Sequence, residues 1–333
     1  MKNAQEHIVD SFGRRHNYLR ISLTEKCNLR CFYCMPLEGV PHREAGKFMT
    51  TEEVVGIAQE FVRLGVDKIR LTGGEPLVKK GAEDIIRALG KLPITLSLTT
   101  NGILVYRFID VFKEAGITSL NVSLDSLQED RFNAISRRSY FKQIMENIQL
   151  LLDHDFRVKI NVVLIKGTND DEIVDFVQWS VREQISVQFI EFMPFDGNNW
   201  DREKTVSEGE ILATLDDHFG KQNIEKLEDS PNSTSRNFKI DGAKGSFGII
   251  STVTNPFCDS CNRIRLTADG KIKNCLFSND EADLLQAFRQ GNDLTPIIQT
   301  ALFKKKAGLG GLRQLDNETI DSHENRSMIT IGG

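Results

Sequence analysis

Short apolar runs alternate with amphipathic stretches at a steady spacing between residues 18 and 193. The runs have the length and composition of buried strands, which we expect at 18–23, 68–71, 94–98, 119–124, 158–164 and 186–192. Helices are expected between them, since Thr50-Thr51-Glu52-Glu53 and Asn169-Asp170-Asp171-Glu172 are typical helix starts, and another helical stretch follows Gly81. This alternation predicts repeated βα units that build a parallel sheet.

Six βα units are two fewer than a complete (β/α)8 barrel contains. We therefore predict an α/β fold, namely an open partial (βα)6 barrel similar to the TIM barrel. Beyond Pro194 the pattern changes, because residues 195–204 are rich in Asp, Gly and Asn and residues 227–236 are polar and turn-prone. The predicted division is a barrel over residues 1–195 and a C-terminal region over residues 196–333.

Composition excludes several broad classes of protein. The chain has 333 residues, 40% hydrophobic and 27% charged, which is ordinary for a globular protein with a large core. The formal net charge of -5 argues against bulk attraction to nucleic acid or to an anionic membrane, so an anionic ligand needs locally placed cations. There is no apolar run long enough to span a bilayer, and the N-terminus lacks a signal-peptide core. We therefore expect a cytoplasmic location.

The six cysteines fall into two groups of three. The first group follows the first predicted strand with the spacing C-x-x-x-C-x-x-C, and the second lies in the C-terminal region: Cys27, Cys31 and Cys34, then Cys258, Cys261 and Cys275. In a chain without an export signal such groups indicate metal sites, although three disulfides would fit an exported protein. Soft thiolates in threes suit iron–sulfur clusters, and the missing fourth ligand leaves one iron open to a reactant.

A structural zinc ion is the alternative for both groups. Zinc sites normally have four protein ligands, and no histidine lies close to the first group. The alternative is stronger for Cys258 and Cys261, because C-x-x-C is common in zinc knuckles. Two incomplete sets in one chain favour two clusters, each with an open iron.

A glycine-rich turn, Gly73-Gly74-Glu75-Pro76, ends the second predicted strand. Glycines let the backbone approach a ligand closely, and Glu75 could accept a hydrogen bond from an ammonium group. The alternative is an ordinary turn between a strand and a helix.

Cationic residues share one face on several predicted strands, because side chains alternate with a period of two. They are Arg20 beside Ser22 and Thr24, Lys68 with Arg70 and Thr72, Lys159 with Asn161, and Arg263 with Arg265 around Ile264. For each one alone, a solvent-facing ion pair is the alternative. Together they predict a positive cavity that suits a polyphosphate.

Two further motifs have simple structural interpretations. Lys304-Lys305-Lys306 is expected on a solvated helix face. The terminal Gly332-Gly333 is expected to be frayed backbone, with insertion into a narrow cavity as the alternative.

The first cysteine motif, with an aromatic residue at Tyr33, resembles the signature of the radical S-adenosylmethionine (SAM) superfamily. Nearly the whole chain closely resembles one of its families, the GTP 3′,8-cyclases of molybdenum-cofactor biosynthesis. The matching stretches are Asp10-Ser-Phe-Gly-Arg14, Leu19-Arg-Ile-Ser-Leu-Thr-Glu-Lys-Cys-Asn-Leu-Arg-Cys31, Lys68-Ile-Arg-Leu-Thr-Gly-Gly-Glu-Pro76, Thr99-Thr-Asn-Gly102, Asn121-Val-Ser-Leu-Asp125, Phe192-Met-Pro-Phe-Asp-Gly197, Cys258-x-x-Cys-Asn-Arg-x-Arg265 and the final Gly-Gly.

This resemblance implies a lyase that converts GTP into (8S)-3′,8-cyclo-7,8-dihydroguanosine 5′-triphosphate, using two 4Fe-4S clusters and SAM. The first cysteine group would bind the SAM-chelating cluster, and the second a cluster whose open iron contacts guanine. Implied SAM contacts are Tyr33, Gly74, Glu75, Ser123 and Met193. Implied GTP contacts are Arg20, Arg70, Thr100, Lys159, Arg263 and Arg265. Gly332 and Gly333 would enter the active site, which reverses the expectation of a frayed end.

The resemblance also implies partners. These are a homodimer, a downstream cyclic pyranopterin monophosphate synthase and an electron donor such as flavodoxin or ferredoxin, without nucleic acid or membrane. Two rival functions stay open at this point. One is a two-cluster radical enzyme that modifies a peptide side chain, and the other is a non-catalytic redox or zinc-binding protein.

Overall fold

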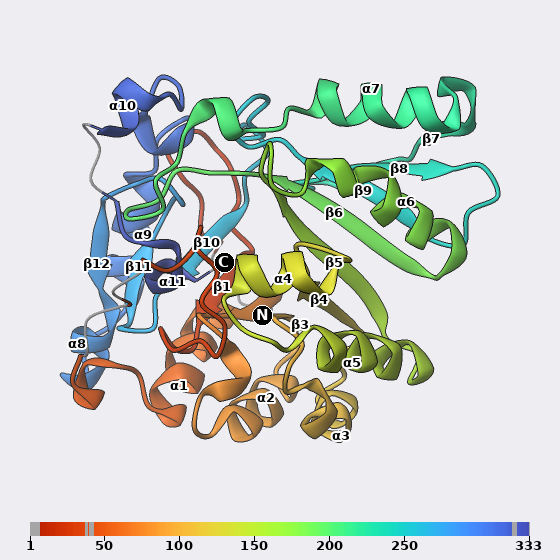
Figure 1. Cartoon of the computed structure of the whole chain (residues 1–333). Helices are drawn as coiled ribbons and strands as arrows, with labels where there is room; N and C mark the ends of the chain where they lie inside the picture. Colours follow the sequence, from red (N-terminus) through yellow and green to blue (C-terminus); the bar gives the residue numbers. More distant parts are fainter. Residues whose placement is uncertain (1–6, 37–38, 40–42, 322–324, 333) are drawn as a thin grey trace.

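Six strands in the first part of the chain form a parallel sheet in sequence order (Figure 1). The computed structural model describes residues 7–36, 39, 43–321 and 325–332. The strands are β1 (Tyr18–Ser22), β2 (Lys68–Thr72), β3 (Thr95–Thr100), β4 (Ser119–Ser123), β5 (Arg157–Leu164) and β6 (Ile185–Glu191). Each pairs in parallel with the next, which confirms the predicted βα order.

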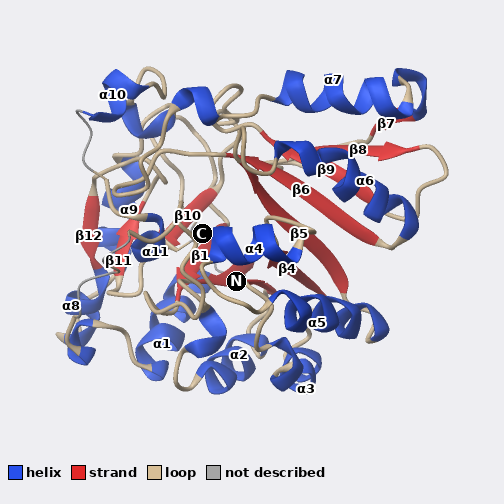
Figure 2. Cartoon of the chain, in the orientation of Figure 1, coloured by secondary structure: helices blue, strands red, loops and turns tan. Residues whose placement is uncertain are grey.

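Helices connect these strands. They are α1 (Thr51–Arg63), α2 (Ala82–Gly90), α3 (Ile109–Glu114), α4 (Glu129–Ser136), α5 (Phe141–Asp153) and α6 (Ile173–Arg182). Figure 2 shows α1, α2, α3 and α5 along one side of the sheet. The predicted start of α1 is a capping box, in which the Thr50 side chain accepts from the Glu53 backbone and the Glu53 carboxylate accepts from the Thr50 backbone. The helix then buries Ile57 and Phe61 in the core that also contains Leu19 of β1.

The remainder of the chain extends the sheet at both edges. Its elements are α7 (Glu208–Phe219), β7 (Ile224–Lys226), β8 (Arg236–Ile240), β9 (Ser246–Ile250), β10 (Arg263–Leu266), β11 (Lys271–Lys273), β12 (Glu281–Asp283), α8 (Leu284–Arg289), α9 (Thr295–Phe303), α10 (Asn317–Asp321) and α11 (Met328–Ile331). β9 lies parallel to β6 and β10 lies parallel to β1. The strand order is β12-β11-β10-β1-β2-β3-β4-β5-β6-β9-β8-β7, so the described sheet is open, as expected for a partial barrel. The boundary after residue 195 stays a prediction, since strands from both sides of it share this sheet.

Strand alternation and register place the cations. Leu19 and Ile21 of β1 are fully buried in the hydrophobic core, whereas Arg20 between them points to the opposite face. In the parallel register, Arg20 stands beside Arg70 of β2 on one side and Arg265 of β10 on the other. Three neighbouring strands therefore carry a row of guanidinium groups on the inner face of the sheet.

One expectation for the C-terminal region is corrected by burial. Lys304 and Lys306 are exposed, but Lys305 between them is only 4% exposed, so the predicted solvated face is wrong for it. The chain turns after α9, and this turn directs the Lys305 side chain inward. Gly332 is buried, and Figure 1 shows α11, which precedes it, close to β1. Gly333 lies outside the described residues. No helix in the described part of the chain is long and apolar enough to cross a membrane.

Candidate active site

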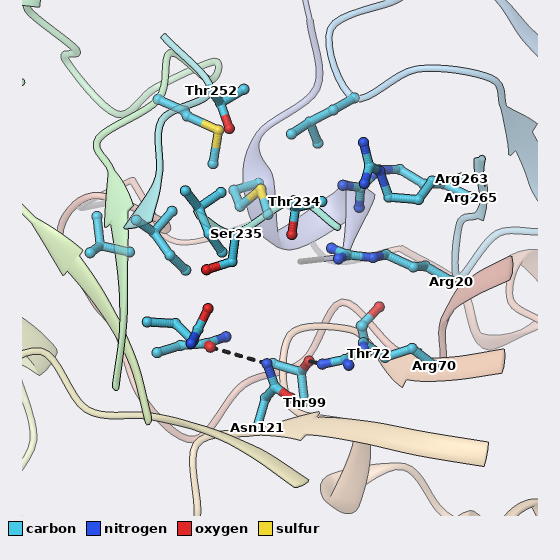
Figure 3. Close-up of a pocket in the computed structure, with 18 of the residues that line it drawn as sticks. Arg20, Arg70, Thr72, Thr99, Asn121, Thr234, Ser235, Thr252, Arg263 and Arg265 are labelled. Atoms are coloured by element: carbon cyan, nitrogen blue, oxygen red, sulfur yellow. Dashed lines mark hydrogen bonds between the residues drawn. The ribbon is translucent and has the colours of Figure 1, made fainter. Parts of the chain in front are cut away.

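A cavity of about 800 Å³ runs along the inner face of the partial barrel. Both cysteine groups line it, and so do Arg20, Arg70, Arg263 and Arg265. Figure 3 shows these four guanidinium groups entering from one side, with Thr234, Ser235 and Thr252 on the other. Residues from distant parts of the sequence therefore meet in one space, which is the usual location of an active site in a barrel of parallel strands.

The first cysteine group lies in the loop after β1. The loop is folded on itself, because the backbone N–H of Cys34 donates to the carbonyl oxygen of Cys31 over 3.0 Å. It is also attached to the end of α4, since Phe32 N–H donates to the Ile135 carbonyl over 3.1 Å. Burial, followed by the neighbouring Cys27, raises the pKa of Cys34 to about 12. Without positive charge nearby these thiols stay protonated, and cluster iron would supply that charge.

All six thiols are available as metal ligands. Among the described residues, no group of three or more His, Cys, Asp or Glu side chains is arranged to hold one metal ion. The six cysteines are free of disulfides. A four-iron cluster binds each thiolate through a different iron, so its ligands need not meet at one point. The three free thiols of each group line the cavity and fit the ligand chemistry of an iron–sulfur cluster.

The glycine-rich turn after β2 packs against the cysteine loop. Glu75 N–H donates to the Lys26 carbonyl over 2.8 Å, and a Cβ atom on Gly74 would lie only 2.5 Å from that same oxygen. Glycine is therefore required at this close approach. The Glu75 carboxylate accepts from the Thr100 hydroxyl and from Asn101 N–H, each over 2.7 Å, and burial raises its pKa to about 7. Gly74 and Thr100 line the cavity, whereas Glu75, which was also implied as a SAM contact, is buried behind them and is not part of the lining.

The other residues implied as SAM contacts also line this cavity, namely Tyr33, Ser123 and Met193. Tyr33 is held by its hydroxyl, which donates to the Asp125 carboxylate over 2.6 Å. Asp125 also accepts from Val163 N–H of β5 over 2.9 Å, and burial raises its pKa to about 6. The cysteine loop is thus tied to the central strands through Tyr33.

The second cysteine group lines the same cavity from the C-terminal part of the chain. Cys258 and Cys261 share a turn before β10, where Cys261 N–H donates to the Cys258 carbonyl over 3.0 Å, and Cys275 follows β11. Burial raises the pKa of Cys261, but the positive charges of Arg263 and Lys305 outweigh it and lower the pKa to about 6. The two cysteine groups therefore differ in electrostatics, since cations stand beside the second.

The arginine row is electrostatically unfavourable when no anion is present. Burial, then the charges of Arg20 and Arg263, lower the pKa of Arg265 to about 9. Arg20 Nε is buried without a hydrogen-bond partner among the described residues. Arg70 donates to the Tyr18 hydroxyl over 2.6 Å and so keeps a fixed orientation. Like charges held this close repel one another, and a bound polyanion would offset the repulsion. Lys159 lies on the same cavity wall.

Sequence reasoning missed two contributors to the site. Residues 230–235 were expected only to be a polar turn, yet they line the cavity across from the arginines. Lys305 was assigned to the solvent. The local spacing of residues in the sequence indicates neither contribution, because long-range strand pairing and the turn after α9 place these residues at the site.

Comparison with known proteins agrees with this geometry. The model of the Radical SAM superfamily matches residues 21–180, and the model named Molybdenum Cofactor Synthesis C matches residues 185–310. GTP 3′,8-cyclase of Listeria welshimeri is 40% identical over 333 residues, which cover 98% of this chain and 99% of that protein. Molybdenum cofactor biosynthesis protein 1 of Dictyostelium discoideum is 44% identical over 98% of this chain. The chain spans about half of that relative, 52% of its length.

Among solved structures, Streptococcus suis SuiB bound to S-adenosylmethionine has a TM-score of 0.66 at 15% identity, covering 95% of this chain and 72% of that chain. The open βα sheet, with three cysteines in the loop after its first strand, defines the radical SAM class, which is an enzyme superfamily. Within it, the chain belongs to the GTP 3′,8-cyclase family of molybdenum-cofactor biosynthesis, so the predicted family is confirmed. Membership implies a 4Fe-4S cluster and SAM as cofactors.

Proposed function

We propose that this chain converts GTP into 3′,8-cyclo-7,8-dihydro-GTP, the first step of molybdenum-cofactor biosynthesis. One observation carries the proposal: both cysteine groups and the in-register arginine row line the same cavity. The name of the Listeria relative supports the same reaction. A peptide-modifying enzyme would have no need for a row of guanidinium groups suited to phosphate.

The first half of the site would generate the radical. Cys27, Cys31 and Cys34 would hold a cluster with one open iron, and Tyr33, Gly74, Ser123 and Met193 would contact SAM. When bound, the cluster and SAM would supply the radical chemistry that removes hydrogen from ribose carbon 3 of GTP. The chain's own task is to orient the two reactants and to exclude groups that would quench the radical. Glu75 has the positioning task of holding the Gly74 segment against the cysteine loop.

The second half would hold the substrate. Cys258, Cys261 and Cys275 would hold a second 4Fe-4S cluster, which would supply an open iron to the guanine ring. Arg20, Arg70, Lys159, Arg263 and Arg265 would bind the triphosphate, and Thr100 would add a further contact with GTP. Anchoring both ends of GTP would hold carbon 3 and carbon 8 in fixed positions, which favours ring closure over competing reactions.

We also propose the partners of this chain that the family resemblance implies. They are a homodimer, a flavodoxin or ferredoxin as electron donor, and cyclic pyranopterin monophosphate synthase as the enzyme that consumes the product. A cytoplasmic location also stays a prediction.

Anaerobic reconstitution followed by metal analysis tests the two-cluster proposal. We expect about eight irons per chain, and about four in a variant with Cys258, Cys261 and Cys275 all replaced by alanine. Zinc in the C-terminal site would contradict the proposal. With reductant and SAM, the formation of 5′-deoxyadenosine should depend on GTP, and indifference to GTP would contradict the reaction.

Arginine variants test substrate binding separately. Arg263→Ala and Arg265→Ala should weaken GTP binding about tenfold or more, because each removes charged hydrogen bonds from a buried site. Iron content and uncoupled SAM cleavage should remain measurable. Arg107→Ala, at an exposed position outside the cavity lining, is the matched control and should bind GTP normally. Loss of the N-terminal cluster in the cavity variants would count against these roles.

A further inference from the structure

A buried lysine stands beside the second cysteine group. Lys305 follows α9, and its ammonium group donates to the Cys261 sulfur over 3.3 Å and to the Arg263 carbonyl over 3.1 Å. The side chain is 4% exposed, whereas Lys304 and Lys306 point to solvent. Burying an ammonium group is costly unless its donors are satisfied, so a lysine at this position indicates a specific acceptor rather than general solubility.

The loop that carries Lys305 is fastened to the cysteine turn from a second side. Leu309 N–H donates to the Cys258 sulfur over 3.4 Å. The Arg14 guanidinium donates to the carbonyl oxygens of Cys258 and Ala307 over 2.9 and 2.7 Å, and it is held by the Asp10 carboxylate at 2.6 Å. The loop after α9 is therefore held at a constant distance from the cysteine sulfurs.

The first cysteine group has a different environment. A neutral donor stands beside it, since the Asn101 amide lies 3.8 Å from the Cys27 sulfur, and the Asp125 carboxylate approaches through Tyr33. No ammonium group donates to this group among the described residues, whereas one donates directly to the second. An iron–sulfur cluster gains one negative charge on reduction, so a nearby cation stabilises the reduced form.

We propose that Lys305 is a positioning residue for the second cluster: its charge and its hydrogen bond to the Cys261 sulfur raise that cluster's reduction potential and orient this ligand. The proposal rests on the second cluster of the proposed function. Hydrogen bonds to ligand sulfurs and neighbouring charges are established means of setting cluster potentials. Lys305 acts only through Cys261, and it is not among the residues that line the cavity.

Redox titration of the reconstituted full-length protein, followed by electron paramagnetic resonance, tests this role. The two cluster signals are assigned by adding SAM, which perturbs the first, and GTP, which perturbs the second. Lys305→Met removes the charge and the donors but keeps the length of the side chain. We expect the midpoint of the GTP-sensitive signal to move to a more negative potential and the SAM-sensitive midpoint to stay in place. Lys305→Arg keeps the charge and should restore the midpoint, and Lys304→Met is the exposed control.

The outcomes separate the failure of this proposal from that of the proposed function. An iron content of four per unsubstituted chain would show that the second cluster is absent and would overturn the proposed function. Eight irons with the same GTP-sensitive midpoint in Lys305→Met would overturn the role of Lys305 alone. Equal shifts in Lys305→Met and Lys305→Arg would also overturn it, because they indicate a packing effect. If Lys305→Met loses the second cluster, the GTP-sensitive midpoint is measured in Lys305→Gln instead, because this variant keeps a neutral donor. The same comparison with the unsubstituted chain then tests the role of Lys305.

Discussion

The Arg265 guanidinium donates a hydrogen bond to the carbonyl oxygen of Gly332 over 2.7 Å. This contact joins β10 to the residue that follows α11, so Gly332 lies at the inner face of the barrel. Arg265 also stands in register with Arg20. The same side chain therefore belongs to the cationic wall of the cavity and holds the tail in place, which couples the order of the tail to the charge of the site.

Replacement of Gly332 by alanine should displace the tail. Gly332 has φ of +86°, and an added Cβ atom would lie 2.6 Å from the Ser22 side chain and 2.9 Å from the Thr72 hydroxyl. We expect loss of most product formation, measured as GTP turnover, with iron content unchanged. Gly291→Ala is the matched control, because its φ is +71° but nothing lies within 4 Å of the added atom. It should cost only about 1 kcal/mol of stability and leave turnover intact. Equal turnover in both variants would contradict the role of the tail.

Arg326 anchors the same tail from outside the cavity. Its guanidinium donates to both carboxylate oxygens of Asp269 over 3.0 and 3.1 Å and to Glu281 over 2.6 Å. Arg326→Ala leaves the buried Asp269 carboxylate with less compensation, so we expect a loss of about 1–3 kcal/mol and faster hydrogen exchange over residues 328–332. Mass spectrometry of the exchanging amides measures this. Arg87→Ala breaks an exposed ion pair with Glu114 and should leave the stability nearly unchanged. Unchanged exchange in the tail would refute the anchor.

Tyr18 should ionise near neutral pH when no anion is bound. Burial opposes ionisation, but the charges of Arg20, Arg70 and Lys68 outweigh it and lower the pKa of Tyr18 to about 7. Below that pH the phenol is neutral, and above it the phenolate adds a negative charge to the cavity. The affinity for GTP should therefore fall as pH rises through about 7, and this fall should be smaller in Tyr18→Phe.

Difference absorbance of tyrosinate measures the ionisation itself. One of the four tyrosines should titrate at this low pH, and Tyr18→Phe should abolish the signal. Tyr106→Phe, at a site 53% exposed, is the control and should keep it. A titration that persists in Tyr18→Phe would contradict the assignment. Comparison of GTP affinity between the two variants isolates Tyr18 from the ionisation of the nucleotide.

Much of the barrel could be predicted from local patterns. The six parallel strands and the capped start of α1 follow from apolar periodicity and from the hydrogen-bonding chemistry of Thr50, which act within a few residues. The attachment of β9 to β6 and of β10 to β1 could not be predicted in this way. These pairings join segments far apart in the chain, and short strands of similar composition carry no local signal for their partners.

The candidate site also has one part that local sequence predicts and another part that depends on tertiary packing. The spacing of Cys27, Cys31 and Cys34 indicates a cluster because one loop can supply all three thiolates. The burial of Lys305 and the contact between Arg265 and Gly332 depend on where distant segments pack. A lysine in a run of three has the same sequence signature in solvent as beside a sulfur, so only its surroundings distinguish the two.

By itself the sequence determined the βα repeat, the two incomplete sets of thiolates and the family to which the chain belongs, because each rests on residue order and spacing. The tertiary structure alone decided that both sets face one cavity and that Arg20 lies between Arg70 and Arg265. It also decided that one lysine of three points at a cysteine sulfur. The physical reason is that strand register and burial are properties of the packed chain, and they set the electrostatic environment in which each side chain acts.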